Sequence, residues 1–203
     1  MVSLVSPIVA CGGGEDAVLA RAARDGSGRA AGELFDRHAP VIRRILARTL
    51  GPSRDVEDHV QETFLVFFRE LPGLRDDDAV RAFLVSIAVR IARGELRRRR
   101  VRRILQLFGP EEIAEVAGPG NADDLEAREA VRRLFAILDA LDTTSRLVFS
   151  LRHLEGMELA EVATALGESL ATVKRRLARV APIVRARIAK DELLAAYAGE
   201  GIA

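Results

Sequence analysis

Two short segments near the C-terminal end of the chain have the residue types and spacing of a pair of packed helices. Val162, Ala163 and Leu166 fall on one face at helical spacing, and the small Ala163 allows a second helix to cross closely. Gly167 follows where a tight turn needs a residue without a side chain. Ser169 can cap the next helix. This spacing is typical of a helix-turn-helix.

The second helix of this pair is strongly basic on its outer side. Val173 and Leu177 form its inner face, and no acid stands between Ser169 and Lys190. A helix with one-sided positive charge fits the major groove, where basic side chains contact phosphates and base edges. A solvated helix face is the simpler alternative, but the turn residues and the charge coincide, which favours DNA binding. The bases of this segment are Lys174, Arg175, Arg176, Arg179, Arg185, Arg187 and Lys190.

A second basic tract occupies residues 90–103, where eight arginines stand against the single acid Glu95. Like charges at this density repel one another unless a polyanion neutralises them. A solvated helix end is again the alternative, and phosphate contact is favoured over it. The two basic tracts are separated by an acidic stretch rich in glycine and proline, so the sequence predicts two DNA contacts joined by a tether.

The segment 55–64 precedes the first basic tract and indicates a protein-binding face. With Val60 and Phe64 turned inward, an acidic and amide face with one exposed leucine falls on the outer side. That face suits a protein partner, although an ordinary polar helix face explains it equally well. His59 is expected at the surface and not as a metal ligand. The outer residues are Asp58, Gln61, Glu62 and Leu65.

Bulk composition excludes several function classes. The 203 residues carry a net charge of only +1, which conceals the two basic tracts, and the single cysteine, Cys11, cannot form an internal disulfide. No run approaches the ~18 apolar residues of a membrane span, so no membrane insertion and a cytoplasmic location are expected. The three histidines lack metal spacing, and glycines 12–14 lack the lysine of a phosphate loop. We therefore expect no catalytic residue, no metal and no cofactor.

Helical periodicity runs through the whole chain, and strand signals are absent, which predicts an all-α fold with two small domains joined by a flexible linker. Pro40 marks a bend or a fresh helix start. The predicted boundaries are a disordered N-terminus over 1–14, a first domain over 15–103, an acidic linker over 104–128, a helix-turn-helix domain over 129–190 and a tail over 191–203.

These segments together resemble the extracytoplasmic-function group of bacterial sigma factors, within the sigma-70 family. Residues 55–64, Asp-Val-Glu-Asp-His-Val-Gln-Glu-Thr-Phe, are similar to the Asp-Ala-Glu-Asp-Leu-Val-Gln-Glu-Thr-Phe block of region 2. Residues 94–100, Gly-Glu-Leu-Arg-Arg-Arg-Arg, are similar to the arginine run that ends its next helix. Residues 155–163 and 172–177 resemble region 4. The likeness covers about residues 15–103 and 129–188.

The resemblance implies a non-enzymatic protein that binds core RNA polymerase and promoter DNA and directs transcription initiation. It implies that the outer face of 55–65 docks on the clamp helices of the largest subunit, that the flap is a second contact, and that an anti-sigma factor is a further potential partner. It also implies three sets of DNA contacts. The −10 element would meet the loop residues Arg75, Asp76, Asp77, Asp78 and Arg81, which capture a flipped base, and Arg97, Arg98, Arg99 and Arg100, which hold phosphates. The −35 element would meet Ser169, Thr172, Lys174, Arg175, Arg176 and Arg179.

The chain departs from the family pattern at several places. Glu168 stands where an apolar residue usually packs the turn, Arg175 where serine is usual, and Arg90 where asparagine is frequent. Phe68 replaces tryptophan, and residues 142–143 replace a Pro-Pro-like start. The promoter sequence therefore does not carry over. Two alternatives stay open: a helix-turn-helix regulator that binds an operator by itself, and a sigma-like interaction protein that does not initiate transcription.

Overall fold

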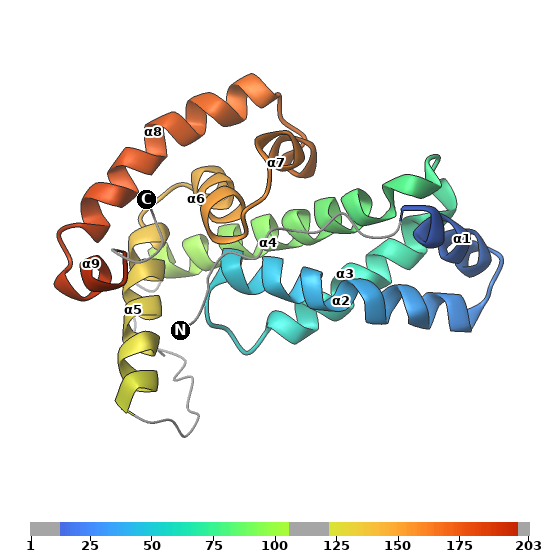
Figure 1. Cartoon of the computed structure of the whole chain (residues 1–203), viewed down its shortest axis with the longest axis horizontal. Helices are drawn as coiled ribbons and strands as arrows, with labels where there is room; N and C mark the ends of the chain where they lie inside the picture. The colour runs from blue at the N-terminus through green and yellow to red at the C-terminus, as the bar shows by residue number, and fades with distance from the viewer. Residues whose placement is uncertain (1–12, 106–121, 199–203) are drawn as a thin grey trace.

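The computed structural model describes residues 13–105 and 122–198, and every regular element in these ranges is helical (Figure 1). This confirms the predicted all-α class. The N-terminal domain contains α1 (Gly13–Arg24), α2 (Gly28–Leu50), α3 (Val56–Glu70) and α4 (Val80–Leu105), with short 3-10 turns at Leu71–Gly73 and Asp77–Ala79. The C-terminal domain contains α5 (Ala122–Asp139), α6 (Thr143–Phe149), a π-helical turn (Ser150–Leu154), α7 (Leu159–Leu166), α8 (Leu170–Ile188) and α9 (Glu192–Ala198).

The N-terminal domain is built around α2, α3 and α4, whose apolar faces meet in one core. Phe64 and Phe67 of α3 are buried, and their rings contact further phenylalanines, with Phe35 of α2 at 4.6 Å between ring centroids and Phe83 of α4 at 5.9 Å. α2 continues through Pro40, where the sequence predicted a bend or a fresh start. Pro40 lies on the exposed side of the helix, so water can hydrate the carbonyl that loses its partner.

The C-terminal domain contains the predicted helix-turn-helix as α7, a turn and α8. Gly167 ends α7 with a left-handed backbone, φ +66°, the conformation that glycine adopts without steric cost. The Ser169 side chain then accepts a hydrogen bond from the backbone amide of Thr172 at 3.2 Å and caps α8. At the start of α6, the Asp142 side chain caps in the same way through the amide of Ser145, at 3.0 Å.

The helices extend beyond the boundaries that composition suggested. α5 begins at Ala122, inside the predicted linker 104–128, and α9 lies inside the predicted tail 191–203. Three of the acids that suggested a linker, Asp123, Asp124 and Glu126, stand at the N-terminal end of α5, where the helix dipole favours negative charge. The mobility predicted for the linker falls largely on residues 106–121, and the predicted N-terminal disorder largely on residues 1–12; both ranges lie outside the described residues.

The two domains also pack against each other. α7 lies against α4, and the π-helical turn lies against α2 (Figure 1). One apolar core therefore runs through both domains, joining Ile45 and Leu84 of the first to Leu147, Val162 and Val173 of the second. No sequence pattern indicated this packing, because helical periodicity reports which face of a helix is buried and not which element packs against it.

Candidate nucleic-acid and protein-binding surfaces

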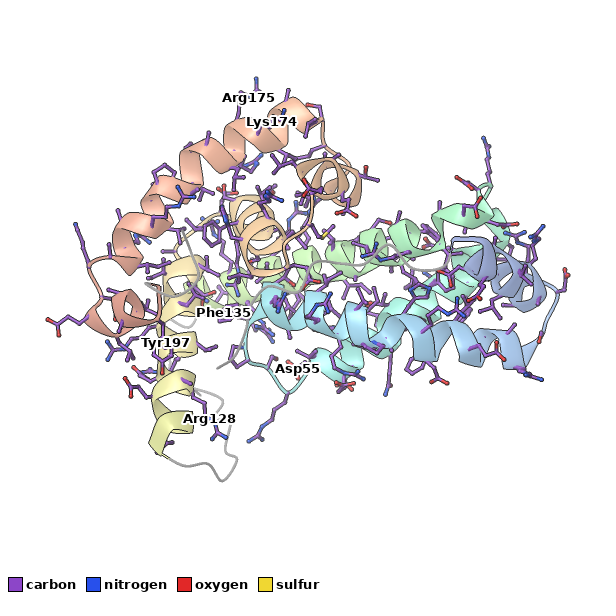
Figure 2. All side chains as sticks on the ribbon, in the orientation of Figure 1. Asp55, Arg128, Phe135, Lys174, Arg175 and Tyr197 are labelled. Carbon is purple, nitrogen blue, oxygen red and sulfur yellow. The ribbon has the colours of Figure 1, made fainter. Side chains whose placement is uncertain are left out.

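The outer side of the helix-turn-helix carries exposed positive charge. Val173 is fully buried on the inner face of α8. Lys174 and Arg175 are exposed near the N-terminal end of the same helix, at the outer edge of the molecule (Figure 2). Thr172 is half-buried and its hydroxyl lies 2.8 Å from that of Ser169. Arg175 reaches the same threonine hydroxyl at 3.5 Å and is otherwise solvated. Lys174 and Arg175 are therefore positioned to contact a polyanion.

Arg176 and Arg179 differ from these two because acidic neighbours attract them. Arg176 lies 3.6 Å from Asp142 and 3.8 Å from Glu168, and its side chain is only 24% exposed. Arg179 lies 3.9 Å from Asp142 and remains largely exposed. Burial raises the pKa of Asp142, but hydrogen bonds from Ser145 and the charges of the two arginines lower it on balance, so the carboxylate stays ionised. Arg176 thus braces the turn at Glu168, the position where the family pattern has an apolar residue.

The arginines at the end of α4 form two groups, because some bind Glu95 and others face solvent. This buried carboxylate accepts hydrogen bonds from Arg98 at 3.0 Å, Arg99 at 2.8 Å and Arg102 at 2.9 Å. Arg97 and Arg100 are exposed and form no ion pair within the described part of the chain. The sequence analysis missed that Glu95 binds part of the tract. The spacings i+3, i+4 and i+7 could have shown it, because they place these three arginines on the side of the helix that carries Glu95.

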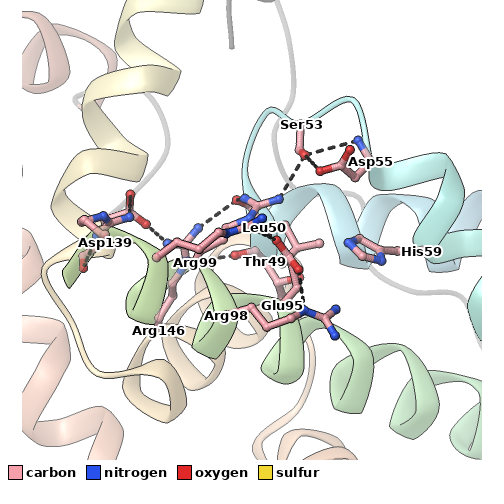
Figure 3. A network of polar contacts seen from close by, with 12 residues as sticks. Thr49, Leu50, Ser53, Asp55, His59, Glu95, Arg98, Arg99, Asp139 and Arg146 are labelled. Atoms are coloured by element: carbon pink, nitrogen blue, oxygen red, sulfur yellow. Dashed lines mark hydrogen bonds and ion pairs between the residues drawn. The ribbon is translucent and has the colours of Figure 1, made fainter. Parts of the chain in front are cut away.

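Arg99 also binds the C-terminal end of α2. It donates to the backbone carbonyl of Leu50 and to the hydroxyl of Ser53, both at 3.0 Å (Figure 3). A carbonyl at a helix C-terminus has no partner within the helix, so Arg99 satisfies the end of α2. Of the four arginines predicted to hold phosphates, Arg97 and Arg100 are thus the most available, Arg98 is exposed but paired, and Arg99 is held inside.

The outer face of α3 is exposed at all four predicted positions. Asp58, Gln61 and Glu62 face solvent, and the apolar side chain of Leu65 is 73% exposed. His59 is buried, with Nδ1 3.4 Å from a carboxylate oxygen of Glu62, so its expected surface position is wrong. It stands one position before Val60, on the side of α3 that turns toward the core.

The loop between α3 and α4 combines exposed and paired residues. Arg75, Asp76 and Asp78 are exposed, and Asp76 accepts a hydrogen bond from the amide of Asp78 at 3.0 Å. Asp77 is instead bound by Arg24 of α1 at 2.6 Å. Arg81, at the start of α4, is half-buried. The structure therefore brings Asp77 into the fold and leaves three of the predicted loop residues open to a ligand.

Residues 13–105 and 122–198 contain neither a membrane-spanning helix nor a cluster of metal ligands. No helix there has the length and apolar character to cross a membrane. No cluster of three or more histidine, cysteine, aspartate or glutamate side chains there could hold a metal ion.

Comparison with known proteins gives the family. The model of Sigma-70 region 2 matches residues 34–102, and that of Sigma-70 region 4 matches residues 132–180. The chain is 37% identical over 173 residues to RNA polymerase sigma factor CnrH of Cupriavidus metallidurans, covering 81% of this chain and 89% of the relative. It is 29% identical over 174 residues to the ECF RNA polymerase sigma-E factor of Escherichia coli strain K12, with the same coverage of both chains.

A solved structure agrees with the sequence relatives. The structure of CnrH in complex with the cytosolic domain of CnrY matches with a TM-score of 0.63 and 29% identity, covering 87% of this chain and 99% of that one. The matched family regions contain α3, the arginine tract of α4 and the first part of α8. The chain therefore belongs to the extracytoplasmic-function group of the sigma-70 family and is a sigma factor of RNA polymerase.

Proposed function

We propose that this sigma factor works in the cytoplasm, without catalysing a reaction of its own, by joining core RNA polymerase to promoter DNA through separate surfaces. The observation that carries the proposal is the arrangement of exposed groups: a face of acidic, amide and leucine side chains on α3 and one exposed basic surface in each domain. A helix-turn-helix regulator that acts alone would need only the surface of α8.

The polymerase contact is assigned to α3. A leucine that is 73% exposed, flanked by the exposed Gln61 and Glu62, is costly to leave in water and suits burial against a partner. By analogy with the family, the partner surface is the pair of clamp helices in the largest subunit. The C-terminal domain is assigned to the flap, so that polymerase holds both domains.

The DNA contacts are assigned to the two basic surfaces. Arg97 and Arg100 of α4 would bind phosphates beside the −10 element, while the open loop residues Arg75, Asp76 and Asp78 would receive an unstacked base. Lys174, Arg175 and Arg179 of α8 would meet the −35 element in the major groove. Arg99 and Arg176 would act indirectly, since their side chains are engaged inside the protein.

A protein antagonist is part of the proposal. The structural neighbour CnrH was solved in complex with the cytosolic domain of CnrY. A comparable anti-sigma partner for this chain would have to compete for the exposed face of α3, or for another surface that polymerase needs. Affinity capture with the purified chain as bait, followed by competition with core polymerase, would identify it.

Run-off transcription is the direct test. Purified chain and core polymerase, incubated with genomic fragments, should give discrete transcripts that neither component gives alone. A chain that binds fragments without polymerase and yields no transcript would be a helix-turn-helix regulator. A chain that binds polymerase yet never yields a transcript would be an interaction protein, which is the second open alternative.

A further inference from the structure

The contact between the two domains contains a charge cluster built around one buried carboxylate. Glu155, at the end of the π-helical turn, is 1% exposed. Its carboxylate accepts hydrogen bonds from Arg44 at 2.7 Å and 2.9 Å and from Arg48 at 3.0 Å, and both arginines belong to α2. We call these three residues the Glu155 cluster. All of its ion pairs cross from one domain to the other.

Two further arginines, one from each domain, bind backbone carbonyls of the other domain. Arg146 of α6 donates to the backbone carbonyls of Thr49 and Leu50 at the end of α2, both at 3.0 Å (Figure 3). Arg93 of α4 donates to the carbonyl of Leu166 at the end of α7, at 3.0 Å. Each domain thus supplies a cation to a helix C-terminus of the other, where unpaired carbonyls and the helix dipole favour positive charge.

These contacts differ from ordinary surface ion pairs because the residues that accept them are buried, although the side chains of Arg44 and Arg48 are 36% and 24% exposed. Burial lowers the pKa of Arg146 to about 10, so its guanidinium is still charged at neutral pH. Separating the domains would return Glu155 and its arginines to water, where each can be hydrated. Removing Glu155 leaves two neighbouring cations without their carboxylate, and removing Arg44 leaves the buried Glu155 with Arg48 alone, so each change disfavours the packed arrangement.

The packed arrangement is too small to read a whole promoter. Elements centred about 25 base pairs apart lie roughly 85 Å apart along B-form DNA. A compact chain of this length has a radius of gyration of about 17 Å and a diameter of about 45 Å. α8 and the arginine tract of α4 therefore cannot occupy both elements while α7 rests on α4.

We propose that the chain holds itself in a closed, promoter-incompetent state through the Glu155 cluster, and that core polymerase engages both domains only after this contact opens. The inference rests on the proposed function, since it concerns access to the same polymerase and DNA surfaces. In the closed state, Arg103 of the basic tract is also occupied, by Asp139 of α5 at 2.8 Å. Opening would release that arginine toward DNA.

Small-angle scattering and polymerase binding of the full chain test the proposal. We expect the wild-type protein to have a radius of gyration near the compact value of about 17 Å. Glu155→Gln and Arg44→Met should each raise it by several ångströms and tighten the apparent affinity for core polymerase by about tenfold, because a larger fraction of molecules is binding-competent. Together the two substitutions should add little to either one, because they remove the same contact.

Arg43→Met is the matched control. Arg43 precedes Arg44 in α2, but it pairs with Glu57 of α3 at 2.5 Å, on the surface of the N-terminal domain. This variant should keep the wild-type radius and affinity. Far-UV circular dichroism must show that the helicity of every variant is unchanged, and Arg44→Met provides a second route to the open state if Glu155→Gln does not fold.

The outcomes separate the two proposals. An extended wild-type chain, or cluster variants with wild-type radius and affinity, would overturn the closed state while leaving the sigma function intact. Cluster variants that open but bind polymerase more weakly would also overturn it, because opening would then not be the limiting step. Failure of the wild-type chain to support run-off transcription would instead count against the proposed function.

Discussion

At the scale of single residues, exposure separates arginines that the sequence treats alike. Arg175 and Arg176 are neighbours in the same helix, yet Arg175 faces solvent and Arg176 is drawn toward Asp142 and Glu168. Helical periodicity predicted that both lie outside the buried stripe of Val173. It could not predict that Asp142, far away in sequence, would attract one of them. Assigning a charge to DNA therefore requires knowing which acids the fold brings near it.

Arg175→Ala should show whether this arginine reads a base. Since serine is usual at this place in the family, we expect a base contact particular to this chain, which is worth about 1–3 kcal/mol of discrimination at one base pair. Titrations of the full chain on −35 duplexes with single-base changes, at two salt concentrations, measure it. A uniform loss of affinity with a salt slope flattened by about one charge would make Arg175 a phosphate contact. No change at all would leave it a solvated charge.

Leu65→Ala should weaken binding to core polymerase without weakening the fold. The side chain is 73% exposed, so its removal should change the free energy of unfolding by less than about 0.5 kcal/mol. As an anchor in an interface it should contribute at least about 1 kcal/mol, or roughly fivefold in affinity. Arg29→Ala, on the exposed side of α2, is the control. Combining Gln61→Ala with Glu62→Ala should have the same direction of effect, and unchanged affinity of both the single and the double variant would remove α3 from the interface.

At the scale of elements, the sequence predicted most helices because each buries one stripe. Val60 and Phe64 placed α3 correctly, and Gly167 located the turn before α8. α5 and α9 were missed or shortened because acids and short length resemble a linker and a tail. The exposure of the α3 face also followed from the stripe. The division of the α4 arginines did not, because it depends on Glu95 and on the end of α2.

This division predicts opposite effects for arginines of the same tract. Replacing Arg97 and Arg100 together by alanine should leave stability unchanged and lower the salt slope of promoter binding by about two charges. Arg99→Ala should lower the free energy of unfolding by about 1–3 kcal/mol, because the buried carboxylate of Glu95 loses a charged donor and the end of α2 loses two hydrogen bonds, although Arg146 still donates to Leu50. Denaturant unfolding and salt-dependent DNA titrations on the same proteins compare them. A larger loss of DNA binding from Arg99→Ala would contradict the assignment.

At the scale of the whole molecule, the decisive contacts join residues that no local pattern connects. Arg44 and Glu155 are 111 positions apart, and Arg146 lies 96 positions from Leu50. The sequence predicted two helical domains, and the structure contains both. It did not predict that the domains share a core, or that an arginine of each domain binds a helix C-terminus of the other. Such packing depends on shape and charge across a surface, and these become defined only when both domains have folded.

One buried histidine region in each domain also predicts how the stability of the molecule depends on pH. Burial lowers the pKa of His38 in α2 and of His153 in the π-helical turn below the usual value of 6.5, although Asp16 at 3.0 Å partly opposes the shift at His38. The folded state therefore disfavours protonation of both rings. Their contribution to stability is complete above pH 6.5 and declines as the pH falls toward their folded pKa values, because the unfolded chain binds more protons.

The loss should reach at most about 1.4 kcal/mol per pH unit for each histidine. His153→Phe should reduce this slope, because the ring of His153 packs on Phe149 at 4.7 Å and its buried Nε2 has no hydrogen-bond partner. Phenylalanine keeps the ring contact and cannot be protonated, so stability near pH 7.5 should be equal or higher. Urea unfolding of both proteins between pH 7.5 and 5.0 measures the difference. Identical slopes would show that His153 is protonated as readily in the folded chain as in the unfolded one.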